Sequence, residues 1–132
     1  MTNKVDKIRR ILSAEAQLYR IEQWKMAELE RRLGELEASQ VELIAALNDT
    51  NALHGLFMDT TARRLSLIAE EAERVRRERA EQSLVLKEHA TRVKGCERLL
   101  HDSELSLERE KEGKELLDVV EEHMTGKRTS LP

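Results

Sequence analysis

The chain has 132 residues, of which 37% are charged and 2% aromatic, a composition that excludes an ordinary globule with a thick apolar core. The formal net charge of −3 argues against nucleic-acid binding, which needs a basic surface to displace counterions from phosphates. Apolar residues are dispersed among Glu, Arg and Lys, a pattern typical of long helices that bury one narrow stripe.

A first long helix is predicted for about residues 4 to 47. Its apolar residues recur in heptads, with position a starting at Val5 and position d at Ile8. The a positions are Val5, Leu12, Tyr19, Met26, Leu33, Gln40 and Leu47. The d positions are Ile8, Glu15, Glu22, Leu29, Leu36, Leu43 and Thr50. Most of these residues are apolar, so the pattern predicts a coiled-coil seam along the helix.

A bend is predicted for about residues 48 to 59, because turn-forming residues are dense there. They are Asn48, Asp49, Thr50 and Asn51, followed by His54-Gly55 and then by Asp59-Thr60-Thr61. Asp59 or Thr60 is the expected N-cap of the next helix. The bend also holds the apolar residues Leu53, Leu56, Phe57 and Met58, which form either a cap folded over the end of the coil or a docking tip.

A second helix is predicted for about residues 60 to 125, with Gly126 as its C-terminal stop and a flexible tail over residues 126 to 132. The a positions are Leu65, Ala72, Arg79, Leu86, Val93, Leu100, Leu107, Lys114 and Glu121. The d positions are Ile68, Val75, Gln82, His89, Cys96, Ser103, Glu110, Leu117 and Met124. This seam contains more polar residues than the first.

Charge favours a chain that folds back on itself. The N-terminal segment carries Lys4, Lys7, Arg9 and Arg10, whereas residues 104 to 122 carry eight acidic and three basic residues. An antiparallel fold-back centred near residues 54 to 57 places these charges side by side, and each exposed pair favours it by a few tenths of a kcal/mol, roughly. We therefore predict an all-α protein: a long antiparallel two-helix coiled-coil hairpin forming one domain over residues 1 to 132.

Two further apolar features lie outside a simple seam. The second helix is the longer one, so residues 105 to 124 form a C-terminal helical overhang that contains Leu116, Leu117, Val119, Val120 and Met124. On the first helix, Leu18, Ile21 and Trp24 recur every three residues beside the seam. They form either an exposed binding stripe or a patch buried by a local shift of register.

No residues suggest catalysis, a metal or a cofactor. The four histidines are too scattered to converge on zinc, and a two-stranded rod has no cleft that would shift the pKa of a carboxylate. The segment Gly126-Lys127-Arg128-Thr129 superficially matches the end of a phosphate-binding loop, but Glu121 stands where that motif needs glycine. We expect a protein that is not an enzyme.

The cysteine content and the apolar runs suggest a compartment. A single Cys96 excludes an intramolecular disulfide and fits a reducing environment. No apolar run approaches the roughly 18 residues of a membrane span, and the N-terminus lacks the features of a signal peptide. We expect a cytoplasmic protein without direct membrane insertion.

Two stretches carry a family resemblance: KVDKIRRILSAEAQLYRIEQWKMAELERRL and RVKGCERLLHDSELSLEREKEGKELLDVVEEHM. In them the sequence resembles the flagellar export protein family FliJ and its YscO counterparts in type III secretion, which are small, proline-poor antiparallel coiled coils of similar length. The family's middle segment is richer in aromatic residues than this one, where Phe57 is the aromatic residue.

The resemblance implies a central stalk, similar to the γ subunit of rotary F-type ATPases, that enters the hexameric ring of a secretion ATPase. It implies a location at the inner-membrane export apparatus, with partners that also include the export-gate membrane protein and export chaperones. The expected gate-facing residues are Leu56, Phe57 and Met58. The expected ring-facing residues are Leu116, Leu117, Val120 and Met124. The expected chaperone-facing stripe is Leu18, Ile21 and Trp24.

A rival interpretation of the same heptads is a homodimeric, parallel coiled-coil scaffold without an ATPase partner. The hairpin should be monomeric, whereas the scaffold must be a dimer. The sequence favours the hairpin because the registers of the two helices differ across the bend.

Overall fold

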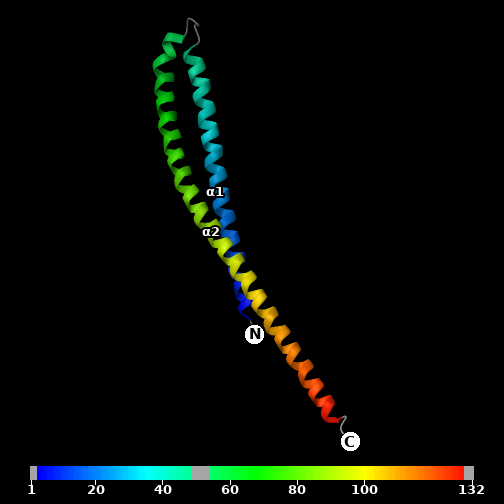
Figure 1. Ribbon diagram of the computed structural model, residues 1–132. Coiled ribbons are helices and arrows are strands. Elements are labelled where there is room, and N and C mark those ends of the chain that lie inside the picture. The colour runs from blue at the N-terminus through cyan, green and yellow to red at the C-terminus, as the bar shows by residue number, and fades with distance from the viewer. Residues whose placement is uncertain (1–2, 49–53, 130–132) are drawn as a thin grey trace. The chain divides into compact units, whose positions relative to one another are not determined.

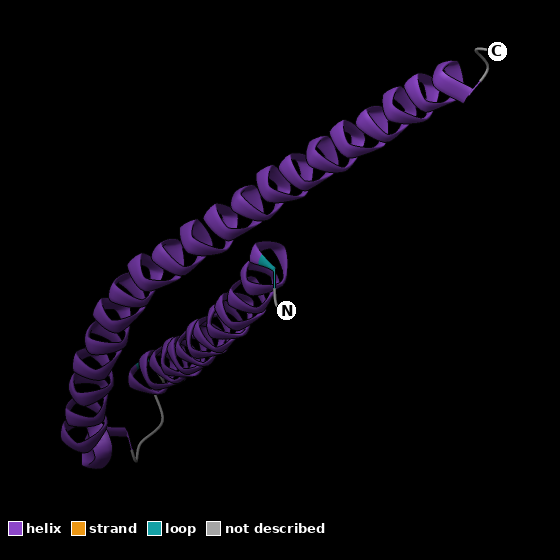
Figure 2. Ribbon diagram, turned by 90° about the horizontal axis from the view of Figure 1, so that it is seen from below, coloured by secondary structure: helices purple, strands orange, loops and turns teal. Residues whose placement is uncertain are grey.

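The structure is a computed structural model that describes the backbone of residues 3–48 and 54–129 and the side chains of residues 3–48 and 57–126. It contains two helices, α1 (Lys4–Leu47) and α2 (His54–Thr129), and the described residues include no strand (Figure 2). The predicted all-α class is thereby confirmed. The chain divides into two compact units, Ala16–Thr91 and the pair Met1–Glu15 with Arg92–Pro132, and each contains part of α1 and part of α2.

Helix α1 has the predicted bounds, and its first turn explains where it begins. The side-chain oxygen Oδ1 of Asn3 accepts a hydrogen bond from the backbone N–H of Asp6 at 2.8 Å, so Asn3 is the N-cap. Asp6 also lies in the first turn, where a negative charge interacts favourably with the helix dipole. At the other end, the N–H of Asn48 donates to the carbonyl of Ile44 at 3.1 Å, which continues the helical pattern by one residue.

Helix α2 is longer than the sequence suggested at both ends. It begins at His54, so the predicted N-cap at Asp59 or Thr60 is wrong, and it continues through Gly126 to Thr129. The reason is energetic: Asp and Thr inside a helix cost only about 0.5–0.7 kcal/mol each relative to Ala, and no proline lies nearby. Residues 54 to 57, where the fold-back was expected to be centred, lie in α2. The turn-formers Asp49, Thr50 and Asn51, together with Leu53, lie outside the described residues.

In the unit Ala16–Thr91, α1 and α2 lie side by side and run in opposite directions (Figure 1). Cross-helix contacts fix the pairing: Gln82 bonds to Glu22, and Arg32 pairs with Glu71 at 3.3 Å. The core consists of Leu33, Ala72 and Val75, which are 5%, 0% and 1% exposed, with Leu29 and Leu36 packed against it. Ala72 has a small side chain, which permits close approach of the two helices here.

The predicted heptad positions coincide with the buried face. Every described a and d position of α1 is buried or half-buried. On α2 the same holds from Leu65 to Ser103, with the exception of Arg79, which is exposed. From Leu107 onward the a and d positions are exposed, so the helix continues past its pairing with α1.

In the unit formed by Met1–Glu15 and Arg92–Pro132, the first turns of α1 pack on α2. Val5 and Ile8 are buried there, at 6% and 8% exposure. Arg9 forms an ion pair with Glu104 at 3.0 Å, which confirms that the basic N-terminal segment lies beside the acidic segment of α2. In this unit, all described residues beyond Ser103 are exposed.

Candidate protein-binding surfaces

A polar layer interrupts the seam of the unit Ala16–Thr91. The amide nitrogen of Gln82 donates to a carboxylate oxygen of Glu22 at 2.6 Å and to the Glu22 backbone carbonyl at 3.0 Å. The hydrogen bond from Gln82 lowers the pKa of Glu22 below its ordinary value, and Lys25, 3.2 Å away, acts in the same direction. Glu22 and Gln82 are both d positions, so this layer fixes the register of the two helices.

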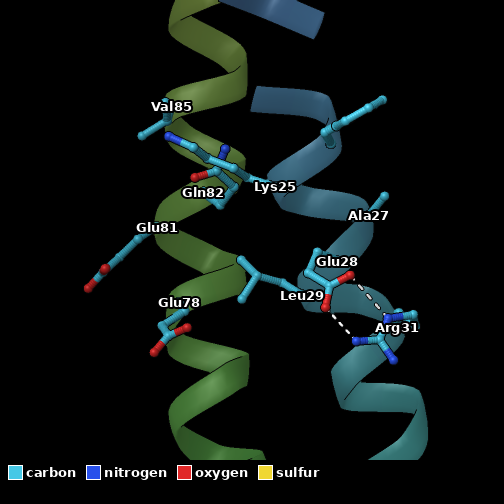
Figure 3. Close-up of a pocket in the computed structure, with 10 residues that line it drawn as sticks. Lys25, Ala27, Glu28, Leu29, Arg31, Glu78, Glu81, Gln82 and Val85 are labelled. Carbon is cyan, nitrogen blue, oxygen red and sulfur yellow. Dashed lines mark hydrogen bonds and ion pairs between the residues drawn. The ribbon is translucent and has the colours of Figure 1, made fainter. Parts of the chain in front are cut away.

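Beside that layer lies an open groove between α1 and α2, which we call the Trp24 groove (Figure 3). Its volume is about 940 Å³. It is lined on α1 by Trp24, Lys25, Ala27, Glu28, Leu29 and Arg31, and on α2 by Glu78, Glu81, Gln82 and Val85. Trp24 is 78% exposed and Ile21 is 52% exposed, so the predicted stripe Leu18, Ile21 and Trp24 is not buried by a shift of register.

The charges on the two helices of this groove are arranged differently. On α1, Arg31 binds both Glu28 and Glu35, and its hydrogen bond to Glu28 raises the pKa of Arg31 and lowers that of Glu28, so the charges are retained. On α2, Figure 3 shows the carboxylates of Glu78 and Glu81 projecting away from α1, and neither forms an ion pair with a described residue. The α2 lip of the groove is therefore acidic.

The residues predicted for the tip lie in the first turns of α2, within a helix instead of a bend. Phe57 and Met58 are 61% and 47% exposed, and the side chain of Leu56 lies outside the described residues. Exposure of a phenylalanine and a methionine on consecutive helical residues gives this end of the unit an apolar surface.

The C-terminal stretch of α2 carries the predicted overhang surface in the other unit. Leu116, Leu117, Val120 and Met124 are between 47% and 66% exposed. Their spacing places them on one helix face, because residues three and four apart are neighbours along a helix. Acidic residues Glu115, Asp118, Glu121 and Glu122 alternate with them. The surface is therefore apolar and flanked by negative charge.

Among the described residues no group of histidine, cysteine and carboxylate side chains is placed to hold a metal ion. Cys96 is half-buried at its predicted d position. The ring nitrogen Nδ1 of His89 is inaccessible and has no hydrogen-bond partner in the structure. Gly126, predicted as the C-terminal stop of the second helix, lies within helix α2.

Over the part of the chain that the structure describes, neither helix contains a stretch long and apolar enough to span a membrane. No protein-family model matches the chain, and neither the curated proteins nor the solved structures gave a match.

Sequence reasoning located the apolar residues of each surface but missed the α2 side of the Trp24 groove. Glu78, Gln82 and Val85 become part of that surface because α2 lies antiparallel to α1 in the observed alignment. The signal was available: Glu22 and Gln82 are polar d positions whose side chains can hydrogen-bond to each other, and pairing them sets the alignment.

Proposed function

We propose that this chain is a non-catalytic component of a flagellar or type III protein export apparatus, a central stalk that binds the export ATPase ring and the export gate. The observation that carries the proposal is the C-terminal stretch of α2, which extends past its pairing with α1 and exposes Leu116, Leu117, Val120 and Met124. The resemblance in two long sequence stretches supplies the identity of the partners.

Such a surface needs a partner for physical reasons. A single helix of this length is marginally stable in water, and apolar residues on one face contribute stability only when they are covered. The stretch contains Gly113, which lowers its helix propensity further. Binding inside a protein ring would cover the stripe and order the helix at the same time.

The proposed action is mechanical. A stalk without an active site influences an ATPase only by contacting one conformation of its subunits more favourably than another. An apolar stripe on one face of a helix is suited to this, because it contacts the subunits of a symmetric ring unequally. Phe57 and Met58 at the start of α2 are the proposed contact with the gate, and the stripe around Trp24 is the proposed site for escorting chaperones.

The direct test measures ATP hydrolysis by the export ATPase of the same organism, with and without the full chain, together with a sizing run for hexamers. We expect stimulation and hexamer formation. Leu117→Glu should abolish both, because it places a charge in the covered stripe, whereas Val41→Glu, at an equally exposed position on α1, should not. If the wild-type chain neither stimulates hydrolysis nor elutes with the ATPase, the stalk role is wrong.

The gate contact is tested separately by Phe57→Ala in an export assay. Phe57 is 61% exposed, so its removal should impair export while circular dichroism retains the helical signal. Loss of most of the helix in this variant would show that Phe57 is structural and that the assignment of the gate surface is wrong.

A further inference from the structure

The shape of the Trp24 groove suits the binding of a third helix. Leu18, Ile21, Lys25 and Glu28 follow the same spacing of three and four residues as the buried seam, but on a neighbouring face of α1. Of these, Lys25 and Glu28 line the groove, Val85 and Gln82 of α2 complete it, and Leu29 extends toward α2 at its base (Figure 3). A groove that runs between two packed helices accommodates a helix more readily than an extended strand.

The exposed tryptophan supports binding at this place. Trp24 is the chain's single tryptophan, and at 78% it is the most exposed of the large apolar residues that the structure describes. Tryptophan is enriched among residues that dominate binding energy, because it buries a large area at a small entropic cost. The aliphatic stem of Lys25 adds apolar surface beside it.

Charge selects the kind of helix that fits. Acidic residues outnumber basic residues in and around the groove. The groove residues and their ion-pair partners include two cations, Lys25 and Arg31, and five carboxylates: Glu22, Glu28, Glu35, Glu78 and Glu81. Both cations are engaged by α1 carboxylates, so the charge of Glu78 and Glu81 is not balanced within the groove. A bound helix with basic flanks would be attracted and an acidic one repelled.

We propose that the Trp24 groove binds a basic amphipathic helix of a partner protein, which lays its apolar face on Trp24, Leu29 and Val85 and its Lys or Arg residues against Glu78 and Glu81. This binding activity follows from the geometry and charge of one unit and does not require the export role. The experiment uses no component of an export apparatus, so the two proposals fail independently.

The test uses the full chain and a synthetic three-heptad peptide with Leu at positions a and d and Lys at e and g; a matched peptide carries Glu at e and g. Because Trp24 is the single tryptophan, its fluorescence reports on the groove directly. We expect the Lys peptide to shift the emission to shorter wavelength in a saturable way and the Glu peptide to have no effect. The affinity of the Lys peptide should fall as salt is added.

Two variants localise the binding. Glu81→Lys should weaken the Lys peptide about fivefold, since reversing an exposed charge changes binding by about 1 kcal/mol. Glu70→Lys makes the same change on α2 outside the groove, at a residue that is also exposed, and should leave the affinity within about twofold.

Four results would overturn the proposal, three of them obtained with the peptides. Those three are an unchanged Trp24 emission with the Lys peptide, equal binding of the two peptides, and equal effects of Glu81→Lys and Glu70→Lys. A shift that develops with protein concentration in the absence of peptide would also overturn it, because the occupant would then be a second copy of this chain.

Discussion

At the level of single residues, the seam combines a small apolar core with a polar layer, and the two have different tasks. Leu33, Ala72 and Val75 exclude water, whereas Gln82 and Glu22 satisfy each other across the helices. A slipped register would leave the half-buried Gln82 amide and Glu22 carboxylate without these hydrogen bonds, which disfavours the slipped alignment. The apolar residues stabilise the pair of helices, and the polar layer selects one alignment.

The polar layer predicts a dependence of stability on pH. The pKa of Glu22 is lowered in the folded chain, so its contribution is present above the unfolded value, about 4.3, and is lost as pH falls through the folded value. Glu22→Gln should therefore lower the melting temperature at pH 7, and the difference from wild type should shrink toward pH 3. Circular dichroism melts at several pH values measure this difference.

The control for this prediction is Glu42→Gln. Glu42 is an exposed carboxylate on α1 without a hydrogen bond or ion pair to the described residues, so this variant changes net charge equally. Its melting temperature should track wild type at every pH. If the two variants behave alike, the effect reflects overall charge and not the bond from Gln82.

Truncating a side chain in the core should lower the stability of the fold strongly. Leu33 is 5% exposed and lies against Ala72 and Val75, so Leu33→Ala should destabilise the chain by about 2–3 kcal/mol in urea unfolding. Leu67→Ala removes the same atoms from a side chain that is 65% exposed and should change stability by less than about 0.5 kcal/mol. Similar losses in both variants would contradict the assignment of the core.

The heptad pattern predicted most of the buried face correctly, but it did not predict which seam position is exposed. Heptad counting placed Leu33 and Val75 in the seam, because burial in a coiled coil follows directly from period. It also placed Arg79 there, but Arg79 is exposed and lies in a hollow beside Met26 and Glu30. A long charged side chain leaves the seam for solvent, and heptad counting alone does not contain that preference.

At the level of elements, helix ends were harder to predict than helix existence. The absence of internal proline and the seam residues determine that two long helices form. The start of α2 was harder to predict, because the helix propensities of Asp59 and Thr60 differ from those of good helix formers by only tenths of a kcal/mol. The helix therefore continues through both residues and begins at His54. The acceptor on Asn3 was also missed as the cap of α1, although its type and position are typical of an N-cap.

The unpaired stretch of α2 predicts a stabilising substitution. Gly113 lies in a helix without positive φ, and a Cβ added there would meet no atom within 4 Å. Gly113→Ala should therefore favour the helix by about 0.5–1 kcal/mol locally. Amide hydrogen exchange over residues 105 to 126 should slow several-fold in the variant.

Lys111→Ala is the comparison for Gly113→Ala, because it changes helix propensity in the same stretch by only a few tenths of a kcal/mol. Exchange in that variant should stay close to wild type. If Gly113→Ala leaves exchange unchanged, this part of α2 is already held by contacts in solution, and the view of an unpartnered helix is incorrect.

At the level of the whole molecule, α1 and α2 of one chain cover each other's seams, whereas a parallel homodimer would cover each seam with the same helix of another chain. In the unit Ala16–Thr91, the pairs Glu22 with Gln82 and Arg32 with Glu71 connect residues far apart in the sequence and run antiparallel. Light scattering should therefore give a monomer near 15.3 kDa at micromolar concentration. A dimer mass would favour the rival scaffold.

Oxidation of Cys96 is a second test, because it distinguishes the antiparallel hairpin from a parallel homodimer even when the dimer is weak. In a parallel homodimer the two Cys96 residues would occupy facing d positions, and mild oxidation would link them rapidly. In the hairpin, Cys96 is half-buried and the chain contains no second thiol for it to meet. We expect little disulfide-linked dimer on a non-reducing gel under mild oxidant. Rapid linkage of wild type, abolished in Cys96→Ser, would instead establish the parallel dimer and remove the structural basis for a monomeric stalk.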